Sequence, residues 1–313
     1  MRILSIGEPL IEFTARPDAP STFDRRAGGD ALNTAIYLAR LTAPGSVGYL
    51  SCLGDDPHSL WLRRQIEAEG VDTSLVRQCE GRRPGLSFIA TDGAGERSFT
   101  YWRDQSPFRD MFRDGADLTA LDRADTLFLS AVTLAVLRPE GRAALLDALQ
   151  RRRDEGVTIV FDTNYRPVLW SDVATARREI ARAAEIATLL LPSFDDIAAC
   201  FGCADPAAAV ATLRGLSDAE IVLTTGGSAV LRAAACEHVV QRHEIPSSVA
   251  ALDTTGAGDS FNAGLLAARL AGLSTKQAIA GAARLATVVV THPGAIIPRN
   301  VMPVPGLMES LDD

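Results

Sequence analysis

The sequence has no long hydrophobic run. Its 313 residues are 47% hydrophobic, but the longest apolar stretches, such as 283–290, are interrupted and far shorter than the roughly 20 residues of a membrane-spanning helix. A secretory leader is not expected either, because Met1 and Arg2 lead directly into residues 3–6, which we interpret as a first β-strand. These features predict a cytoplasmic globular protein that binds no membrane.

Positive charge and cysteine are also scarce. The net charge of −8 and the pI near 5.1 argue against a broad surface for nucleic acid, so no nucleic-acid partner is expected. The five cysteines, an odd number, predict reduced thiols rather than a disulfide framework. One Cys-x-x-Cys, at 200–203, lacks the second pair or the spaced histidines of a zinc site.

Two common nucleotide-binding motifs are missing. No glycine-rich loop is followed by Gly-Lys-Ser/Thr, and the first strand is followed by one glycine, Gly7, instead of Gly-x-Gly-x-x-Gly. The sequence instead contains Asp-Thr-Thr-Gly-Ala-Gly-Asp at 253–259, directly before an apolar run that begins at Phe261. This string contains the strongest functional signal in the chain.

The residues of this string suit an anion site at the start of a helix. Small side chains at 254–258 leave backbone N–H groups bare, and the helix dipole favours negative charge there. We predict that the amides of Gly256, Ala257 and Gly258 stabilise a phosphoryl group in transfer, and that Asp259 is the general base for the attacking hydroxyl. The alternative is structural, since aspartate in a first turn also complements the dipole.

Residues 121–291 alternate short apolar runs with longer helical stretches. Strands are predicted at 126–129, 157–161, 189–191 and 221–224, and a helix at 139–155 begins with proline and is followed by glycine. This alternation predicts an α/β fold, a doubly wound and mainly parallel sheet flanked by helices. Loops 162–166 and 225–228 follow strands, where ligands bind in such sheets.

Two segments depart from this alternation. Residues 10–23 and 85–103 resemble strands joined by glycine-rich turns, including a hairpin connection at 91–96. From the residues alone they are either peripheral strands or a small separate sheet.

Two motifs resemble the signatures of the ribokinase-like (PfkB) family of sugar kinases. They are the 253–259 string and Gly-Gly-Asp-Ala-Leu-Asn at 28–33, and the resemblance extends from residue 7 to residue 295. The strings at 83–86, 95–103 and 161–167 are similar to those of the 2-keto-3-deoxygluconate kinases, although fructokinases carry several of them too.

The resemblance implies one ribokinase-like domain over residues 1–313. Residues of approximately 10–25 and 85–103 would form a small β-sheet lid that excludes water from the reaction. The implied activity is ATP-dependent phosphorylation of the terminal hydroxyl of 2-keto-3-deoxygluconate.

The resemblance also assigns residues to the sugar. Arginine is the natural partner of a sugar-acid carboxylate, and Tyr101 and Arg103 match residues that hold it in this branch. The alternative for Asp30 is that it caps the helix that follows it. The implied sugar-binding residues are Gly29, Asp30, Asn33, Tyr101, Arg103 and Arg166.

ATP contacts are assigned by resemblance to the loop after the 221–224 strand and to the helix start. Mg²⁺ is expected with few protein ligands, because it binds mostly phosphates and water. The family's Asn-x-x-Glu motif corresponds to Ser-Phe-Asp-Asp at 193–196, so Asp196 is a candidate metal ligand acting through water, or Ser193 merely caps a helix. A monovalent cation is a further candidate cofactor. The implied ATP-binding residues are Thr225, Gly226, Gly227, Ser228, Gly256 and Gly258.

Other interpretations remain at this point. A fructokinase or another neutral-sugar kinase would share the fold, whereas a catalytically silent binding protein would bind ATP without releasing ADP. The strands of the lid have exposed edges, which proteins commonly cover, so a homo-oligomer formed through the lid is expected.

Overall fold

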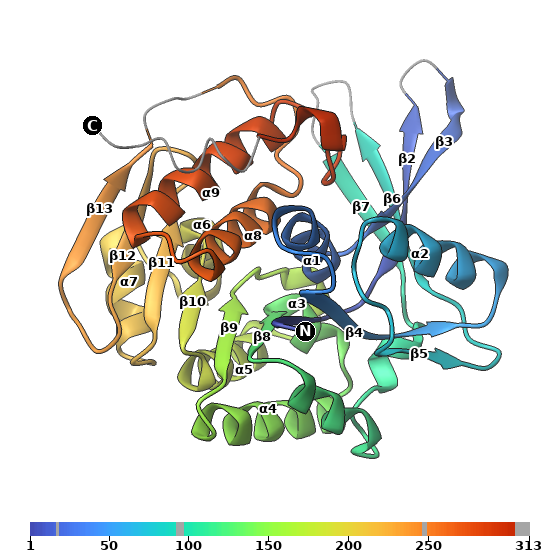
Figure 1. Ribbon diagram of the computed structural model, residues 1–313, viewed down its shortest axis with the longest axis horizontal. Helices are drawn as coiled ribbons and strands as arrows, with labels where there is room; N and C mark the ends of the chain where they lie inside the picture. Colours follow the sequence, from blue (N-terminus) through green and yellow to red (C-terminus); the bar gives the residue numbers. More distant parts are fainter. Residues whose placement is uncertain (17–18, 92–96, 246–248, 304–313) are drawn as a thin grey trace.

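The computed structural model describes residues 1–16, 19–91, 97–245 and 249–303. A nine-stranded sheet divides the molecule (Figure 1). Its neighbouring strands are parallel except where β12 and β13 extend one edge in antiparallel fashion. The strands lie in the order β13 (Val240–Glu244), β12 (Ala229–Ala233), β11 (Glu220–Thr224), β10 (Leu189–Leu191), β9 (Thr158–Asp162), β8 (Thr126–Ser130), β1 (Ile3–Ile6), β4 (Val47–Gly54) and β5 (Val76–Cys79).

Helices cover both faces of this sheet. Helices α1, α8 and α9 pack on one face, and α3 to α7 pack on the other (Figure 1). The helices are α1 (Asp30–Leu41), α2 (Pro57–Ala68), α3 (Ala131–Val136), α4 (Pro139–Asp154), α5 (Val173–Ile186), α6 (Phe194–Phe201), α7 (Pro206–Arg214), α8 (Ala257–Leu270) and α9 (Thr275–Val289), with 3₁₀ turns η1 (Pro107–Asp110), η2 (Ala116–Arg123), η3 (Pro167–Leu169) and η4 (Arg299–Val301).

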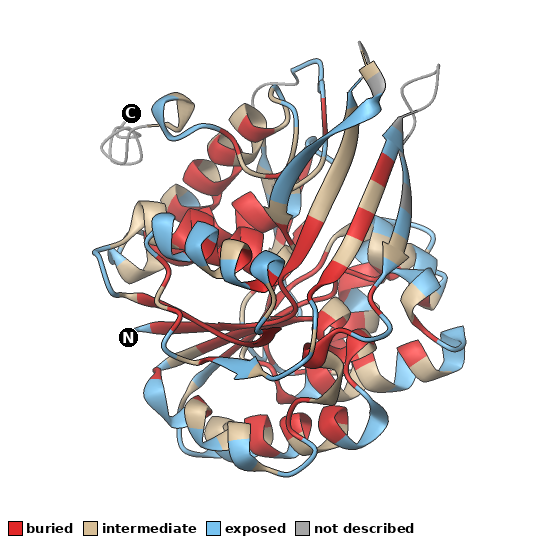
Figure 2. Cartoon of the chain, turned by 90° about the vertical axis from the view of Figure 1, so that its right-hand side faces the viewer, coloured by how far each residue is buried: buried red, intermediate tan, exposed pale blue. Residues whose placement is uncertain are grey.

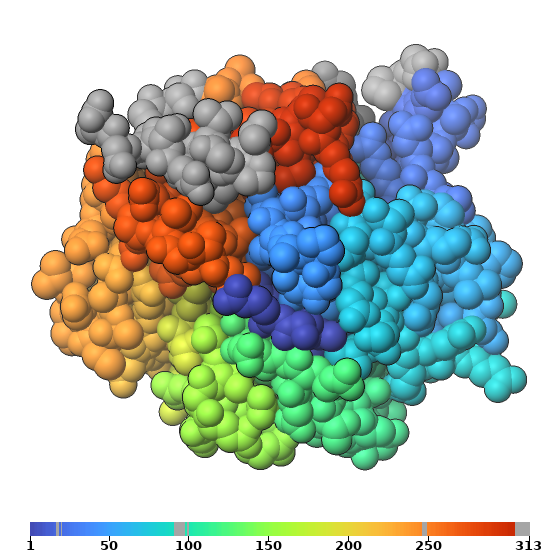
Figure 3. All heavy atoms as spheres, viewed as in Figure 1, coloured from blue at the N-terminus to red at the C-terminus, as the bar shows by residue number. Residues whose placement is uncertain are grey.

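The sheet is buried on both sides because successive side chains of a strand point to opposite faces. Leu127 and Leu129 of β8 pack with the α3 to α7 layer, and Phe128 between them packs with the α1, α8 and α9 layer. Figure 2 shows the buried residues on both sides of the sheet. Helix α1 lies beside α8, so the amino-terminal and carboxy-terminal parts of the chain adjoin on the surface (Figure 3).

A second, smaller sheet stands at one end of the first (Figure 1). Strand β2 is parallel to β6, and the outer strands β3 and β7 are antiparallel to their neighbours. The hairpin connection predicted at 91–96 falls almost wholly outside the described residues. The strands lie in the order β3 (Ala19–Gly28), β2 (Leu10–Arg16), β6 (Gly85–Thr91) and β7 (Arg97–Trp102).

The α/β fold class, with its second small sheet, is confirmed. The four strands predicted between 126 and 224 are β8 to β11, shifted by at most one residue at each end, and the predicted 139–155 helix is α4. The start of helix α1 differs from the alternative in which the side chain of Asp30 caps this helix. Its N-cap is Gly29 and no side chain caps it, so the expectation that Asp30 is the cap is wrong.

The prediction of reduced cysteines is wrong for one pair. Cys52 of β4 and Cys79 of β5 form a disulfide, whereas Cys200, Cys203 and Cys236 are free. The pair forms because β5 lies parallel to β4 with Cys79 opposite Gly54, which brings it diagonally beside Cys52. A separation of 27 residues along the chain gave no sign of this pairing.

The described part of the chain contains no single helix that is long and apolar enough to cross a membrane. Helices α6 and α7 meet that length and composition only together, with a 69° bend between them.

Candidate active site

The carboxyl ends of the parallel strands bring the predicted site residues together. Asp162 ends β9, Ser193 follows β10, and the loop beginning with Thr225 follows β11. Ser193 bridges to Thr224, so the last two of these segments adjoin. On the opposite side of this edge α1 and α8 begin, which places Asp30 and Asp259 at the same end of the sheet.

Helix α8 begins without a side-chain cap. Its N-cap is Gly256 in the left-handed conformation (φ 78°), where an added Cβ would lie 2.6 Å from the carbonyl oxygen of Ala295. The amide of Ala257 donates to the carbonyl of Thr254 at 3.2 Å, so it is less available than predicted. The amide of Gly258 has no acceptor among the described residues, and a Cβ there would meet nothing within 4 Å. The start of α8 is therefore open on one side.

Asp259 lies in the first turn of α8 and is 9% exposed. Asn33 donates to its Oδ2 at 2.8 Å, and within the described residues Asp259 makes no ion pair. Burial raises the pKa of Asp259 well above its usual range, the charge of Asp30 raises it further, and the hydrogen bond from Asn33 lowers it. The carboxylate is thus held by an amide, with a raised pKa and Oδ1 available.

Two further asparagines connect the acidic residues. Asn164 donates to Asp30 at 2.7 Å, and Asn262, one turn after Asp259, donates to Asp162 at 2.9 Å. Burial raises the pKa of Asp162 to about 7. Asp162 and Asn164 lie in the loop 162–166 that was predicted to face a ligand, but neither was singled out, and Asn262 was not predicted. The spacing from Asp259 to Asn262 was a further signal, because it places both on one face of α8.

Arg166 is the cation of this acidic cluster. Its Nη1 donates to Asp196 at 3.1 Å and to the carbonyl of Tyr165 at 2.8 Å. Burial lowers the pKa of Arg166, but four carboxylates outweigh that effect and raise it. They belong to Asp196, Asp30, Asp162 and Asp259.

Asp196 belongs to the first turn of α6. Ser193 caps that helix by accepting from the Asp196 amide at 3.1 Å, as the structural alternative for this segment required. Burial raises the pKa of Asp196, and Arg166 partly offsets this. No group of three or more His, Cys, Asp or Glu in the described chain could hold a metal ion by itself. The predicted role of Asp196 toward Mg²⁺ stays a prediction.

Arg103, which was predicted to bind the carboxylate of a sugar acid, is already paired with a carboxylate of the protein, that of Glu8. Arg103 is 6% exposed, and its Nε and Nη2 both donate to Oε2 of Glu8, which follows β1. Burial raises the pKa of Tyr101, and Arg103 and Arg166 lower it, so the tyrosine lies near both arginines. Glu8 carried no signal in the sequence that would have identified it.

The predicted nucleotide loop is a tight turn between β11 and β12. Thr225 Oγ1 donates to the carbonyl of Ala229 at 2.8 Å and lies 3.0 Å from Ser228 Oγ. Gly226 and Gly227 both have positive φ, and a Cβ on either would meet nothing within 4 Å. The loop thus presents open backbone at the carboxyl edge of the sheet.

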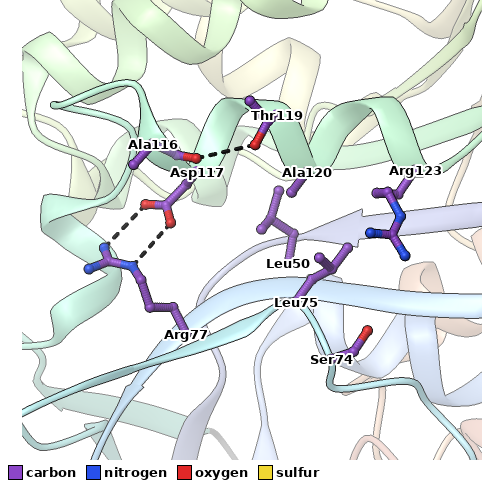
Figure 4. A pocket seen from close by; sticks show the side chains of 9 residues that line it. All are labelled: Leu50, Ser74, Leu75, Arg77, Ala116, Asp117, Thr119, Ala120 and Arg123. Atoms are coloured by element: carbon purple, nitrogen blue, oxygen red, sulfur yellow. Dashed lines mark hydrogen bonds and ion pairs between the residues drawn. The ribbon is translucent and has the colours of Figure 1, made fainter.

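Two surface hollows lie away from these residues. One of about 260 Å³ lies between the β4 and β5 edge and η2, where Arg77 pairs with Asp117 (Figure 4). The other, of about 360 Å³, lies at the amino ends of the central strands beside Arg269. Neither includes Asp259 or any predicted site residue.

A buried carboxylate at an uncapped helix start, on the ligand edge of a doubly wound sheet with a small second sheet beside it, defines a ribokinase-like small-molecule kinase. The chain belongs to the pfkB family of carbohydrate kinases, whose family model matches residues 1–301. It is a carbohydrate kinase.

Characterised kinases align with most of the chain or nearly all of it. A 2-dehydro-3-deoxygluconokinase of Escherichia coli K12 is 35% identical over 311 residues, which are 96% of this chain and 99% of the relative. A fructokinase of Klebsiella pneumoniae is 30% identical over 85% of this chain and 83% of its own. The aminoimidazole riboside kinase of Salmonella enterica, in complex with aminoimidazole riboside and an ATP analog, superposes with a TM-score of 0.81 at 25% identity, covering 99% of both chains.

Proposed function

We propose that this carbohydrate kinase transfers the γ-phosphoryl group of ATP to the terminal hydroxyl of 2-keto-3-deoxygluconate, which is also called 2-dehydro-3-deoxygluconate. The main support is Asp259, a buried carboxylate without an ion pair in the described chain, beside an open helix start. The 35% identity to a 2-dehydro-3-deoxygluconokinase supports the choice of sugar.

Asp259 takes the proton of the attacking hydroxyl on Oδ1, because Asn33 already donates to Oδ2. Its raised pKa makes it a stronger base than an ordinary carboxylate. The amides at the start of α8, with Gly258 the most available, stabilise the charge of the phosphoryl group in transfer. The small second sheet acts as the lid over this reaction.

The sugar lies between α1 and the lid. Gly29 packs against the Glu8 backbone, where an added Cβ would lie 2.5 Å from the carbonyl oxygen, so only glycine fits at this point before α1. Asp30 and Asn33 bind hydroxyls, and Tyr101, Arg103 and Arg166 bind the carboxylate end.

ATP lies along the Thr225–Ser228 turn with its phosphates at the start of α8, where Gly256 and Gly258 contribute backbone amides. The donor set suits Mg²⁺, because carboxylates at one edge of the sheet can bind it through water while the phosphates supply the direct ligands. Asp196 is the candidate for this role, although Arg166 donates to one of its oxygens. Bound Mg²⁺ neutralises phosphate charge. Dependence on a monovalent cation stays a prediction, as does cytoplasmic location.

A second candidate is phosphorylation of a neutral ketose such as fructose. It is supported by the 30% identity to a fructokinase and by the pairing of Arg103 with Glu8, which offsets the positive charge that an acid would seek. The candidate from another functional class is a catalytically silent protein that binds ATP without releasing ADP.

One assay separates these candidates. ADP release is measured with 2-keto-3-deoxygluconate, fructose, ribose and adenosine at matched concentrations. The proposal predicts the highest kcat/KM for the sugar acid. A higher value for fructose would reject the acid in favour of the ketose, and ATP binding without ADP release on any sugar would reject the proposed kinase reaction.

A homo-oligomer that forms through the lid is part of this proposal. One face of the lid carries an aromatic cluster in which Phe88 contacts Phe13, Phe23 and Trp102 with ring centres 5.0 to 5.7 Å apart. Trp102 is 60% exposed and Phe23 is 43% exposed. Exposed apolar surface of this kind commonly serves an interface, and a second copy of the chain would cover it.

A further inference from the structure

The most informative polar group outside the assigned roles is the carboxylate of Glu8. Glu8 is 3% exposed and lies on the link between β1 of the central sheet and β2 of the lid. Nε and Nη2 of Arg103 both donate to Oε2, the former at 2.8 Å. Oε1 is buried and has no hydrogen-bond partner among the described residues. A buried carboxylate oxygen without a donor is costly, so a missing partner is expected.

The register of the lid shows which way this group faces. Glu12 lies opposite Ser87, and Ser87 lies opposite Tyr101, so all three share the face of the lid that is opposite the aromatic cluster. Arg103 follows Tyr101 by two residues and continues this face. The Arg103 guanidinium lies 5.3 Å from the centre of the Tyr101 ring, and the Glu8 backbone packs against Gly29 directly before Asp30, so this face adjoins the start of α1.

Gly85 lies directly beside Oε1. A Cβ built on Gly85 would lie 2.9 Å from Oε1 and 3.2 Å from the Cβ of Arg103, so a larger residue would press on the pair. Other buried polar atoms without a hydrogen-bond partner in the described chain include Asn33 Oδ1, Tyr49 OH, Ser87 Oγ and Thr163 Oγ1.

We propose that Glu8 is a substrate-binding residue: Oε2 fixes Arg103, and Oε1 accepts a hydrogen bond from a hydroxyl of the sugar. The inference rests on the proposed function for the existence of a sugar substrate, but not on which sugar it is. It extends that function by adding a residue that binds a sugar hydroxyl, on the link between β1 of the central sheet and β2 of the lid. Arg103 keeps Nη1 for the substrate, because its other two nitrogens are held by Glu8.

Glu8→Gln tests this role without removing the packing. Two donors of Arg103 point at one oxygen, so the new amide must turn its oxygen toward Arg103 and its NH₂ toward the substrate. A donor then replaces the acceptor, and KM for the preferred sugar should rise about 10- to 100-fold with KM for ATP unchanged. The melting temperature reports whether the variant folds. Glu69→Gln is the matched control, since Glu69 likewise pairs with a buried arginine, Arg40, which is not among the proposed sugar-binding residues.

Deoxy analogues of the sugar identify the hydroxyl. Removing the hydroxyl that Glu8 accepts should raise KM for the wild type by a similar factor and should add nothing in Glu8→Gln. An unchanged KM in a folded Glu8→Gln variant, or equal sensitivity of both proteins to every deoxy analogue, would overturn the proposal. If the wild type phosphorylates no sugar at all, the proposed function fails instead, and the two failures are distinct.

Discussion

At the scale of single residues, the proposed chemistry depends on the contact between Asp259 and Asn33. The amide of Asn33 donates to the carboxylate and favours its ionised form, whereas burial and Asp30 oppose ionisation. A base must be deprotonated to act, so the acid limb of kcat/KM reports the pKa of Asp259 in the free enzyme. That limb should lie at higher pH than an ordinary aspartate would give.

Asn33→Ala should move this acid limb to still higher pH. The substitution removes a hydrogen bond that lowers the pKa of Asp259, so the base gains its proton at a higher pH and activity is lost earlier as the pH falls. The measurement is kcat/KM as a function of pH for the wild type and the variant. Asn262→Ala, whose side chain binds Asp162 instead, is the control and should move the limb less. A limb that stays in place or moves to lower pH contradicts this account of Asp259.

The candidate site residues that could be predicted from the sequence are those that lie within short, distinctive motifs. Asp259, Asp30 and Asn33 were singled out because each lies in a glycine-rich motif at a helix start, and the structure brings Asn33 into contact with Asp259. Glu8 was missed, and Asp162 was predicted only as part of a ligand loop, because their contacts are with partners 95 and 100 residues away, Arg103 and Asn262. Such contacts are set by the packing of whole elements, which a local pattern does not encode.

At the scale of elements, the β4–β5 edge carries the disulfide. Strand β5 is only Val76–Cys79, and the chain continues from it to strand β6 of the small sheet. The bond between Cys52 and Cys79 closes a loop over a separation of 27 residues. In the chain-entropy model a loop of that size contributes about 3 to 4 kcal/mol to the free energy of unfolding.

Reducing this disulfide should therefore lower the melting temperature by several degrees. The Cys52→Ala/Cys79→Ala double variant should melt near the reduced wild type and should not respond to reductant. Cys236→Ala, which changes an exposed free cysteine, should keep the full response. Equal melting temperatures for oxidised and reduced wild type would show that the bond contributes nothing.

Strands that are deeply buried were predicted more closely from the sequence than exposed strands. Strands β8 to β11 are almost wholly buried and read as continuous apolar runs, so their positions were predicted closely. Strand β13 has a mostly exposed, polar sequence and gave no such run. Segments 10–23 and 85–103 were predicted to be strand-like, but β3 extends beyond the first of them to Gly28, and the assembly of these strands into one small sheet came from the family resemblance.

At the scale of the whole molecule, the aromatic face of the lid should govern the oligomeric state. Trp102→Ser should convert a dimer to a monomer in light scattering at micromolar concentration, because it removes the most exposed ring of the cluster. Val239→Ser is the matched control, since Val239 is 69% exposed on the far edge of the large sheet. A wild type that is monomeric at this concentration would rule out the lid interface.

The most direct test of the catalytic account is the turnover of Asp259→Asn with the preferred sugar, measured by ADP release at saturating ATP. We predict that kcat falls about 10²- to 10⁴-fold, with the melting temperature maintained, because the variant keeps the side-chain shape and loses only the base. A folded Asp259→Asn variant that retains a kcat close to that of the wild type would contradict the central claim that this carboxylate activates the sugar hydroxyl.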